Sequence, residues 1–569
     1  MTHTTLPLIL AMLLAASAAA ELKIPANDAV IKTVGGELRD PALNEPGWNL
    51  WSNGQLGDFV QIAEAGKYTV VVRAAGTPAA GDWPEMALSV DNRSLPACTV
   101  KGGKFQDYAF TVELAPGVHR LAVAFLNDGV VPVKPGSTVW KEDRNLYLSQ
   151  VRIKSSAGAP GPARGDARAW RKEIEVREKE VLALADKEIE RLRQADVLVR
   201  VVDAAGKAVS GAQVSAELRR HEFLFGCNIY MFDRFGSAKE NDLYKQRFAE
   251  LFNYATVGFY WRSYEPQRGK PDYAYTDKVV AWCQEHGIRM KGHPLLWGHE
   301  AGVPQWCNGQ PAPEVQKQRV GEILGRYGGK IAAWEVVNEP AHLPDIRIDQ
   351  PYRWARQADP NAYLIVNDYE VLGTGCVPFF DLLSKAKAAG VPFDGIGIQA
   401  HEPVGVRFPL NSVKEILDHY ATLGKDLHIT EFTPTSGGQK ILGEDVEGAW
   451  DDAAQADYAV KFYRTCFGHK AVAAITWWDL CDAGAWQNGG GMLRKDLSPK
   501  PVYAALRRLI GQEWSTRATG RSDKDGSFSF RGFLGQYDVS VNGRRIDGDF
   551  RLTRTPDGKK QGWVLQLRE

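Results

Sequence analysis

In the first part of the chain, a pattern of short hydrophobic runs is followed by a segment with linker composition. Residues 21–154 contain short apolar or alternating runs, such as residues 68–72 and 121–125, separated by Gly, Pro and Asp turns. This pattern is typical of antiparallel strands and predicts a β-sandwich module. Residues 155–169 then have the Ala, Gly and Pro composition of a linker.

Residues 170–220 and 513–569 predict two further small elements. Charges of both signs surround spaced apolar residues between 170 and 194, which indicates a helix, and residues 197–220 predict a β-hairpin around the turn at 204–206. We expect this hairpin to pack against the domain that follows it. Alternation returns near residue 528, so residues 513–569 predict a small separate β domain.

Between residues 221 and 512, short β-rich runs alternate with helical stretches. Eight such runs are spread over this region, and amphipathic segments such as residues 277–286 and 416–423 lie between them. This alternation predicts an α/β fold, a (β/α)8 TIM barrel, whose functional groups sit at the carboxyl ends of the strands. The eight predicted strands are residues 223–225, 254–261, 290–297, 333–338, 363–367, 395–399, 427–431 and 473–478.

The first twenty residues and the cysteines concern the compartment. An apolar run at residues 6–16 followed by small residues up to Ala20 predicts a signal peptide over residues 1–20, although Lys and Arg are absent before the run. No later segment is long and apolar enough to span a membrane. Seven scattered cysteines without a CxxC pair indicate buried thiols and not a disulfide framework. We therefore expect a secreted or periplasmic monomer.

Composition narrows the classes of ligand. The 569 residues carry 69 Lys and Arg against 69 Asp and Glu, so the formal net charge is zero. Because binding to nucleic acid draws on a basic excess, this balance excludes a generic polyanion binder. The 17 Trp, 19 Tyr and 22 Phe serve the core first, but aromatic faces also stack on sugar rings.

Two carboxylates stand at the ends of predicted barrel strands. Glu339 follows the fourth strand and Glu431 ends the seventh. Strand-end glutamates are often structural, but two that face one barrel mouth can divide glycoside cleavage, because one protonates the leaving oxygen while the other attacks the anomeric carbon. The pair therefore predicts a glycoside hydrolase site.

The barrel region resembles the family-10 glycoside hydrolases, which are retaining xylanases with catalytic residues on strands four and seven. The resemblance covers about half of the chain and depends on a set of motifs in the family's order. These motifs are residues 292–297, 334–340, 367–369, 394–401, 429–431 and 499–503, together with Trp478 and Trp486.

The resemblance implies roles for these residues. Glu339 would be the general acid/base and Glu431 the nucleophile, with no cofactor for catalysis. Asn338 would bond the sugar 2-hydroxyl, and His401 would orient Glu431. The other residues implied to bind substrate are His293, Trp297, Asn367, Gln399, Trp478 and Trp486.

The sequence departs from the family pattern in two places. The family has Glu-Asn-x-x-Lys-Trp after strand two, where the polar groups bind sugars on the non-reducing side, whereas this chain has Thr256, Val257 and Tyr260 before Trp261. Lost hydrogen bonds to a substrate change discrimination by orders of magnitude, so the sugar preference differs or uses other residues. Asp479 stands where the family has glycine.

The N-terminal module resembles calcium-dependent xylan-binding modules. The resemblance depends on residues 82–91, 125–128 and 142–147. It implies Ca²⁺ held by Asp128, Asp143 and Asn145, with Glu85 as a further candidate, and hard oxygen ligands suit this ion. On composition alone these residues are turn formers.

Together these observations predict a secreted retaining endo-β-1,4-xylanase that acts on plant cell-wall xylan, with a polysaccharide as partner. One alternative keeps the mechanism and changes the substrate to another β-glycan or a short oligosaccharide. The other is a carbohydrate-binding protein whose barrel does not catalyse. Endo or exo action and the role of the C-terminal region stay open.

Overall fold

The computed structural model describes residues 21–133, 139–155, 161–373, 375–401, 404–443, 445–554 and 560–567. The predicted signal peptide lies outside these residues. The chain divides into two compact units between Glu173 and Ile174. Within the described part of the chain, no helix is long and apolar enough to cross a membrane.

The N-terminal unit is a β-sandwich, as the alternating pattern predicts. One sheet has the strand order β10-β6-β14-β4-β3 with β1 beside β14, and the other has the order β15-β5-β11-β7-β8 with β2 and β9 at its edges. A separate pair, β12 and β13, extends from it. Inward-facing residues such as Val70, Val123 and Ile153 form its core, because alternate side chains of a strand point to the same face. The bounds are β1 Glu21–Pro25, β2 Ile31–Lys32, β3 Gly36–Glu37, β4 Trp48–Leu50, β5 Gly54–Ile62, β6 Gly66–Thr77, β7 Glu85–Val90, β8 Arg93–Ser94, β9 Cys98–Thr99, β10 Gln106–Leu114, β11 Gly117–Phe125, β12 Val130–Pro132, β13 Trp140–Asp143, β14 Asn145–Ser155 and β15 Ala163–Arg164.

The predicted linker at residues 155–169 is only partly a linker. Strand β15 pairs with β5 at Ala163 and Arg164, so the sandwich continues past the expected boundary. Helix α1 (Ala167–Arg193) then begins before residue 170. The sequence missed this edge strand because a two-residue strand between Pro, Gly and Asp has no detectable period.

The second unit contains a closed parallel barrel, which confirms the predicted fold class. The strands pair in the order β20-β19-β18-β26-β25-β24-β23-β22, and β22 also pairs with β20, so the ring of eight strands closes. The strands are buried on both faces, which explains their continuous apolar runs. The barrel strands are β18 Leu224–Asn228, β19 Tyr254–Gly258, β20 Arg289–His293, β22 Ala333–Asn338, β23 Tyr363–Asp368, β24 Gly395–Ile398, β25 Asp426–Phe432 and β26 Val472–Trp477, and β21 Leu296–Trp297 adds to β22.

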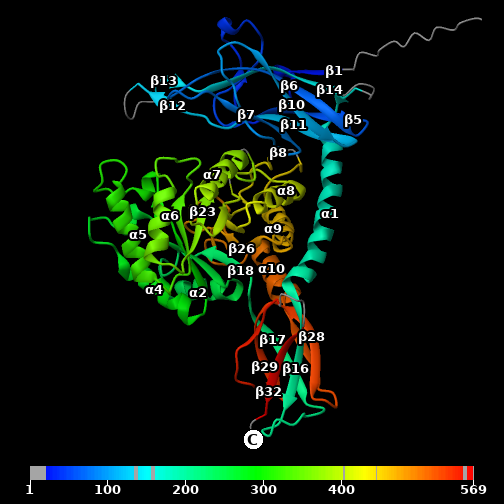
Figure 1. The fold of residues 1–569 in the computed structure, drawn as a ribbon, viewed down its shortest axis with the longest axis vertical. Helices are drawn as coiled ribbons and strands as arrows, with labels where there is room; N and C mark the ends of the chain where they lie inside the picture. Colours follow the sequence, from blue (N-terminus) through cyan, green and yellow to red (C-terminus); the bar gives the residue numbers. More distant parts are fainter. Residues whose placement is uncertain are drawn as a thin grey trace, which may run out of the picture. The chain divides into compact units, whose positions relative to one another are not determined.

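The helices between these strands surround the barrel (Figure 1). Helix α2 begins at a capping box in which Ser237 and Glu240 satisfy each other's backbone N–H groups. The helices are α2 Ala238–Leu251, α3 Trp261–Tyr264, α4 Tyr273–Glu285, α5 Pro313–Tyr327, α6 Asp349–Ala358, α7 Cys376–Ala388, α8 Leu410–Ala421, α9 Asp452–Phe467 and α10 Pro501–Arg508, with short turns η1 Ala26–Asp28, η2 Pro41–Leu43, η3 Glu300–Gly302 and η4 Leu509–Glu513.

The structure differs from the two separate small regions expected at 170–220 and 513–569. Strand β16 (Gln194–Val202) pairs with β28 (Ser527–Phe533) and β32 (Gln561–Gln566), whereas β17 (Gln213–His221) pairs with β27 (Arg517–Arg521) and β29 (Gly535–Val541). Strands β30 (Arg544–Arg545) and β31 (Phe550–Leu552) also pair with β29. The predicted hairpin strands therefore lie in different sheets, and they share these sheets with the C-terminal strands (Figure 1).

Candidate active site

The two predicted glutamates lie at the carboxyl ends of the barrel strands β22 and β25. Glu339 directly follows β22 and has a φ of 56°, in the left-handed region that non-glycine residues rarely adopt. Glu431 is the sixth residue of β25 and is 4% exposed. A strained residue and a buried carboxyl at one mouth are features that cluster at functional sites.

Each carboxylate of this pair has its own hydrogen-bond donors. Trp297 Nε1 donates to Glu339 Oε2 at 2.8 Å, and Gln399 Nε2 donates to Glu339 Oε1 at 3.0 Å. Asn367 Nδ2 donates to Glu431 Oε1 at 2.9 Å. The two side chains are therefore fixed by different strands, with Gln399 following β24 and Asn367 lying in β23.

Gln399 and His401 connect the two glutamates. His401 Nε2 lies 2.9 Å from Gln399 Oε1 and 3.6 Å from Glu431 Oε2. Burial, together with the nearby His293, lowers the pKa of His401 to about 3, so its ring is neutral and donates Nε2–H to Gln399. The sequence predicted that His401 orients Glu431, but the hydrogen bond to Glu431 comes from Asn367.

Asn338 and Asn367 form an amide pair beside the glutamates. Asn367 Nδ2 also lies 2.9 Å from Asn338 Oδ1, and Thr430 Oγ1 donates to Asn367 Oδ1 at 2.6 Å. The strand register places Asn338 opposite Asn367, which brings both side chains to the same edge. These bonds fix the amide orientations, because each oxygen accepts and each NH₂ donates.

A buried charged cluster under the site was not predicted. Glu335 lies in β22 with no exposed surface and pairs with both Lys291 Nζ and His293 Nδ1. Burial acts to raise the pKa of Glu335, but Lys291 and His293 outweigh it and lower this pKa to about 2. A ring nitrogen of His293 and carboxylate oxygens of Glu335 and Glu431 lie within 4.8 Å of one another, a spacing that could hold a metal ion. However, Lys291 already balances the charge of Glu335.

Burial acts on both glutamates of the pair. It is the main cause that raises the pKa of Glu339 above its ordinary value, whereas Gln399 and Trp297 oppose this shift by donating to the carboxylate. Burial and the charge of Glu335 raise the pKa of Glu431 well above its ordinary value, and Lys291 and Asn367 oppose it. The pair as a unit therefore retains a proton at a pH where exposed carboxyls are ionised.

Aromatic rings form the walls of the site. The Trp478 ring lies 5.3 Å from that of His293 in an edge-on arrangement, and Trp486 stacks on His401 at 4.5 Å and 26°. Trp486 is 51% exposed, whereas Trp478 is buried. Together with Trp297, these rings leave flat apolar faces beside the carboxylates, the surface on which a sugar ring stacks.

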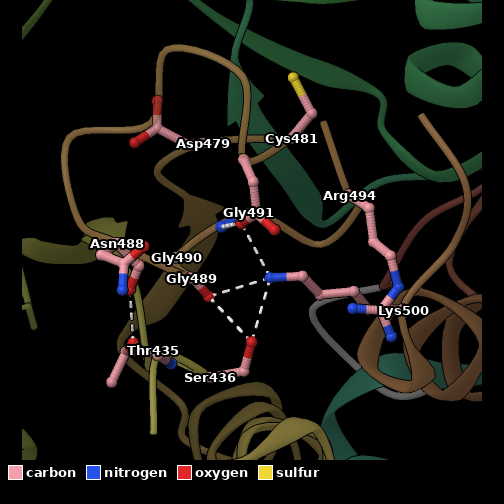
Figure 2. A network of polar contacts seen from close by, with 12 residues as sticks. Thr435, Ser436, Asp479, Cys481, Asn488, Gly489, Gly490, Gly491, Arg494 and Lys500 are labelled. Carbon is pink, nitrogen blue, oxygen red and sulfur yellow. Dashed lines mark hydrogen bonds and ion pairs between the residues drawn. The ribbon is translucent and has the colours of Figure 1, made fainter. Parts of the chain in front are cut away.

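Asp479, the second departure from the family pattern, helps to hold the loop that carries Trp486. Asp479 accepts from Asn228 Nδ2 at 3.0 Å and from the backbone N–H of Trp486 at 2.8 Å. The buried Lys500 Nζ braces the same loop by donating to Asp482 Oδ1 at 2.8 Å, Ser436 Oγ at 3.1 Å and Gly489 O at 3.1 Å (Figure 2). Where the family has a glycine, the Asp479 carboxylate therefore fixes the loop through two hydrogen bonds.

The first departure from the family pattern concerns Thr256, Val257 and Tyr260. Thr256 and Val257 are buried within β19, and Val257 lines a cavity together with Tyr260. The Tyr260 ring reaches the mouth and lies 5.5 Å from His293 and 5.9 Å from Trp297. Tyr230, which the sequence reasoning missed, lies 5.7 Å from Tyr260 and 5.5 Å from Trp478. Its place two residues after β18 is the signal that could have identified it.

In the N-terminal unit, the three predicted calcium ligands lie on or next to the successive strands β12, β13 and β14. Asp128 precedes β12, Asp143 ends β13 and Asn145 begins β14, and the charge of Asp143 contributes to the raised pKa of Asp128, although burial is the larger cause. Asn145 Oδ1 is buried and has no hydrogen-bond partner. Two carboxylates and an unsatisfied amide oxygen are the hard donors that Ca²⁺ prefers, so these residues fit the ion.

Glu85 contacts this region through its backbone. Its N–H donates to Asn127 Oδ1 at 2.6 Å, and Asn127 Nδ2 donates to Trp83 O at 3.0 Å. Arg144 also donates to Ala79 O at 2.6 Å. These bonds fix the loops around the three oxygen donors.

Two different protein families match the N-terminal unit and the barrel. Residues 216–509 match the model of glycosyl hydrolase family 10, which is more than half of the chain. The chain belongs to this family. Residues 69–164 match the Ca-dependent xylan-binding carbohydrate-binding modules, so both resemblances inferred from the motifs are confirmed.

Curated relatives of this family-10 protein match over part of the chain. It is 29% identical over 372 residues to the anti-sigma-I factor RsgI6 of Acetivibrio thermocellus, covering 63% of this chain and 46% of that protein. It is 28% identical over 380 residues to endo-1,4-beta-xylanase 1 of Arabidopsis thaliana, covering 62% and 37%. The chain thus spans less than half the length of these two relatives. Among solved structures, xylanase 10B of Thermotoga petrophila in complex with xylobiose aligns at a TM-score of 0.44 and 23% identity, over 51% of this chain and 95% of that one.

Proposed function

We propose that the protein is a secreted retaining endo-β-1,4-xylanase. Its substrate is plant cell-wall xylan, and its reaction is a double displacement by Glu431 and Glu339. The observation that supports this proposal best is the pair of buried glutamates held by separate donor sets at the ends of β22 and β25. Family membership and the named xylanase relatives agree with it.

In the first step, Glu431 attacks the anomeric carbon and Glu339 protonates the leaving oxygen. The Glu431 Oε–carbon bond forms as the glycosidic bond breaks, and the proton of Glu339 goes to the leaving sugar. The raised pKa of Glu339 keeps that proton available. In the second step, water attacks the glycosyl–enzyme bond while Glu339, now ionised, takes the proton of the water and Glu431 leaves.

The neighbouring residues position the sugar for these steps. Asn338 accepts from Asn367 through its oxygen, so its NH₂ group is the part that donates to the sugar 2-hydroxyl, a bond that strengthens in the transition state. Trp297, Trp478 and Trp486 pack on the ring faces. His293 is fixed by Glu335 and presents its other ring nitrogen.

The N-terminal unit is proposed to bind xylan through Ca²⁺ at Asp128, Asp143 and Asn145. When bound, the ion would accept sugar hydroxyl oxygens as further ligands. A module that holds xylan on the same chain raises the substrate concentration near the barrel without a new activity.

The test is product analysis with defined oligosaccharides. The intact protein is incubated with xylo-oligosaccharides and with β-1,4-gluco-oligosaccharides, and the products are resolved by length and anomeric form. Internal cleavage of the xylose series with a β-anomeric product supports the proposal. An α-anomeric product contradicts the double displacement, and cleavage of the glucose series alone favours the altered substrate suggested by Tyr260. No cleavage of either series favours the non-catalytic alternative.

A further inference from the structure

A cavity of about 350 Å³ lies beside the glutamate pair, at the ends of the first two barrel strands. Its walls come from the segments after β18 and β19 and from the first turns of α4. The volume is within the usual range for small-molecule sites, about 300–1,000 Å³. Its lining includes Tyr230, Arg234, Tyr260, Tyr264, Asp272 and Tyr275.

The cavity and the glutamate site share a wall. Tyr260 lines the cavity and also contacts the rings of His293 and Trp297, and Trp297 donates to Glu339. Tyr230 lines the cavity and meets Trp478. A glycan bound at the glutamates therefore lies one aromatic ring away from the cavity, close enough for a neighbouring sugar or a branch to enter it.

The cavity contains a cation that is not paired. Arg234 lines it, and its guanidinium lies 4.6 Å above the Tyr275 ring while Nε donates to Tyr275 Oη at 3.3 Å. Tyr275 Oη in turn lies 3.0 Å from the carbonyl oxygen of Phe232, which fixes the phenol. Among the residues that the structure describes, no carboxylate lies within ion-pair distance of Arg234.

The acidic group in the cavity has a different place. Asp272 caps α4 by accepting from Ala274 N at 3.2 Å. A carboxylate at a helix N-terminus is stabilised by the helix dipole, so it does not need Arg234. It can accept hydrogen bonds from hydroxyl groups, but it repels an anion that fills the whole cavity.

We propose that this cavity binds a sugar that carries a carboxylate, a uronic acid unit of the glycan cleaved at the neighbouring glutamates. Arg234 pairs with the carboxylate through its planar fork, and the tyrosine rings pack on the pyranose face. Asp272 accepts from a sugar hydroxyl. This assignment rests on the proposed function and adds the class of substrate: acidic, branched xylan in preference to a neutral chain.

The chemistry separates this ligand from simpler ones. A neutral branch leaves the guanidinium without a counter-ion, and an inorganic anion such as phosphate has no apolar face for the tyrosines and meets Asp272. A uronic acid unit satisfies the cation, the aromatic walls and the acceptor together. The charge balance of the whole chain is zero, so the preference arises from this cavity and not from a general basic surface.

The test compares three polymers: a glucuronoxylan, the same glucuronoxylan with its carboxyls reduced to alcohols, and an unbranched xylan. The variants are Arg234→Gln, Arg234→Lys and, as a matched control, Arg262→Gln. Arg262 lies on α3 outside the cavity lining and contacts Glu300 instead. Rates are measured at low salt and at about 0.5 M NaCl, where screening weakens an exposed charge pair.

We expect the unchanged protein to have a kcat/KM about fivefold higher on glucuronoxylan than on the reduced polymer, with a smaller ratio at high salt. In Arg234→Gln this ratio of kcat/KM values should fall to about one. In Arg234→Lys it should lie between one and the value of the unchanged protein, and in Arg262→Gln it should equal that value. No preference in the unchanged protein, or a preference that Arg234→Gln retains, overturns the proposal.

Failure of the proposed function gives a different result, because then none of the three polymers is cut. In that case binding decides. The unchanged protein and Arg234→Gln are titrated calorimetrically with a neutral xylo-oligosaccharide and with one that bears a single uronic acid branch. Tighter binding of the acidic ligand that depends on Arg234 supports the cavity assignment, and equal affinities in the two proteins overturn it.

Discussion

Burial of Glu431 makes the stability of the fold depend on pH. Its pKa lies well above the ordinary 4.5, chiefly because burial disfavours the charged form and the charge of Glu335 adds to this. As the pH rises above 4.5, the folded chain therefore binds more protons at this residue than the unfolded chain. The free energy of unfolding then decreases with rising pH, because the carboxyl ionises more readily in the unfolded state.

Replacing Glu431 by Gln removes this ionisation and the nucleophile together. We expect kcat to fall by about 10³-fold or more, while xylan binding remains. We also expect a higher unfolding temperature than that of the unchanged protein at about pH 8 and a smaller difference at about pH 4. Rates on xylo-oligosaccharides and thermal unfolding at both pH values check this.

The control for this variant is Glu285→Gln, an exposed carboxylate at the end of α4. It should change neither the rate nor the pH dependence of unfolding. Full hydrolysis by Glu431→Gln would contradict its role as nucleophile. A gain in stability that does not vary with pH would contradict the raised pKa.

Asp479 determines how firmly Trp486 is held. The Asp479→Ala variant loses the acceptors of Asn228 and of the Trp486 N–H, so the half-exposed Trp486 ring no longer has one fixed position over His401. We expect KM to rise about three- to tenfold with a smaller change in kcat, because this ring contacts the sugar in both the ground and transition states. Steady-state kinetics and tryptophan fluorescence measure the two effects.

Asp496→Ala is the matched control for this loop. Asp496 is an exposed aspartate in the same segment, and it only caps Ser498. If Asp479→Ala lowers kcat and leaves KM unchanged, Asp479 acts on the chemical step and not on the position of Trp486.

At the scale of single residues, the sequence could predict those that interrupt strand ends. Glu339, Glu431, Asn338 and Asn367 each follow or end an apolar run, and strand ends meet at the barrel mouth. The pair of Lys291 and Glu335 was missed because both lie inside strands, where the pattern alone does not show which charges face each other. Opposite charges in the apolar runs of the third and fourth strands were the available signal.

Helix α1 is more than a spacer in the second unit. Glu178 accepts from Arg407 at 2.8 Å and 2.9 Å and from the N–H of Leu410 at 3.0 Å, and Arg407 also pairs with Asp445. Side-chain exposures are 10% for Glu178 and 5% for Arg407. One helical residue thus connects α1 with the segments that follow β24 and β25.

The Glu178→Gln variant should therefore destabilise the second unit. It removes one charge from a buried network, and we expect the free energy of unfolding to fall by about 2 kcal/mol or more. Glu175→Gln is the matched control, because Glu175 is 67% exposed and pairs with Lys179 at the surface, where solvent screening leaves little stability to lose. Denaturant unfolding compares the two. Equal losses would mean that the network adds nothing to the packing of α1.

Element partners were harder to predict than elements. The eight barrel strands follow from apolar runs of strand length between amphipathic helices, and all eight form. The pairing of β16 with β28 and of β17 with β29 joins residues more than 300 positions apart. Alternation determines which face of a strand is buried, but it does not identify the neighbouring strand, so the two small regions were expected to be separate.

At the scale of the whole molecule, the two units are proposed to act on one polysaccharide by different chemistry. In this proposal the barrel uses its own carboxylates, whereas the N-terminal unit holds Ca²⁺ at Asp128, Asp143 and Asn145. Removing the ion should therefore separate the two activities. Short xylo-oligosaccharides report the barrel alone, and retention on insoluble xylan reports the N-terminal unit.

We expect EDTA to weaken retention on insoluble xylan by about tenfold or more, and added Ca²⁺ to restore it, because the oxygen donors do not bind the sugar firmly without the ion. Hydrolysis of short xylo-oligosaccharides should not change. Asp128→Asn should have the same effect as EDTA, whereas Glu113→Gln, an exposed carboxylate on β10 of the same unit, should have none. Retention that persists in EDTA would overturn the calcium model. A loss of hydrolysis in EDTA would show that the barrel also needs a metal, which the pairing of Glu335 with Lys291 argues against.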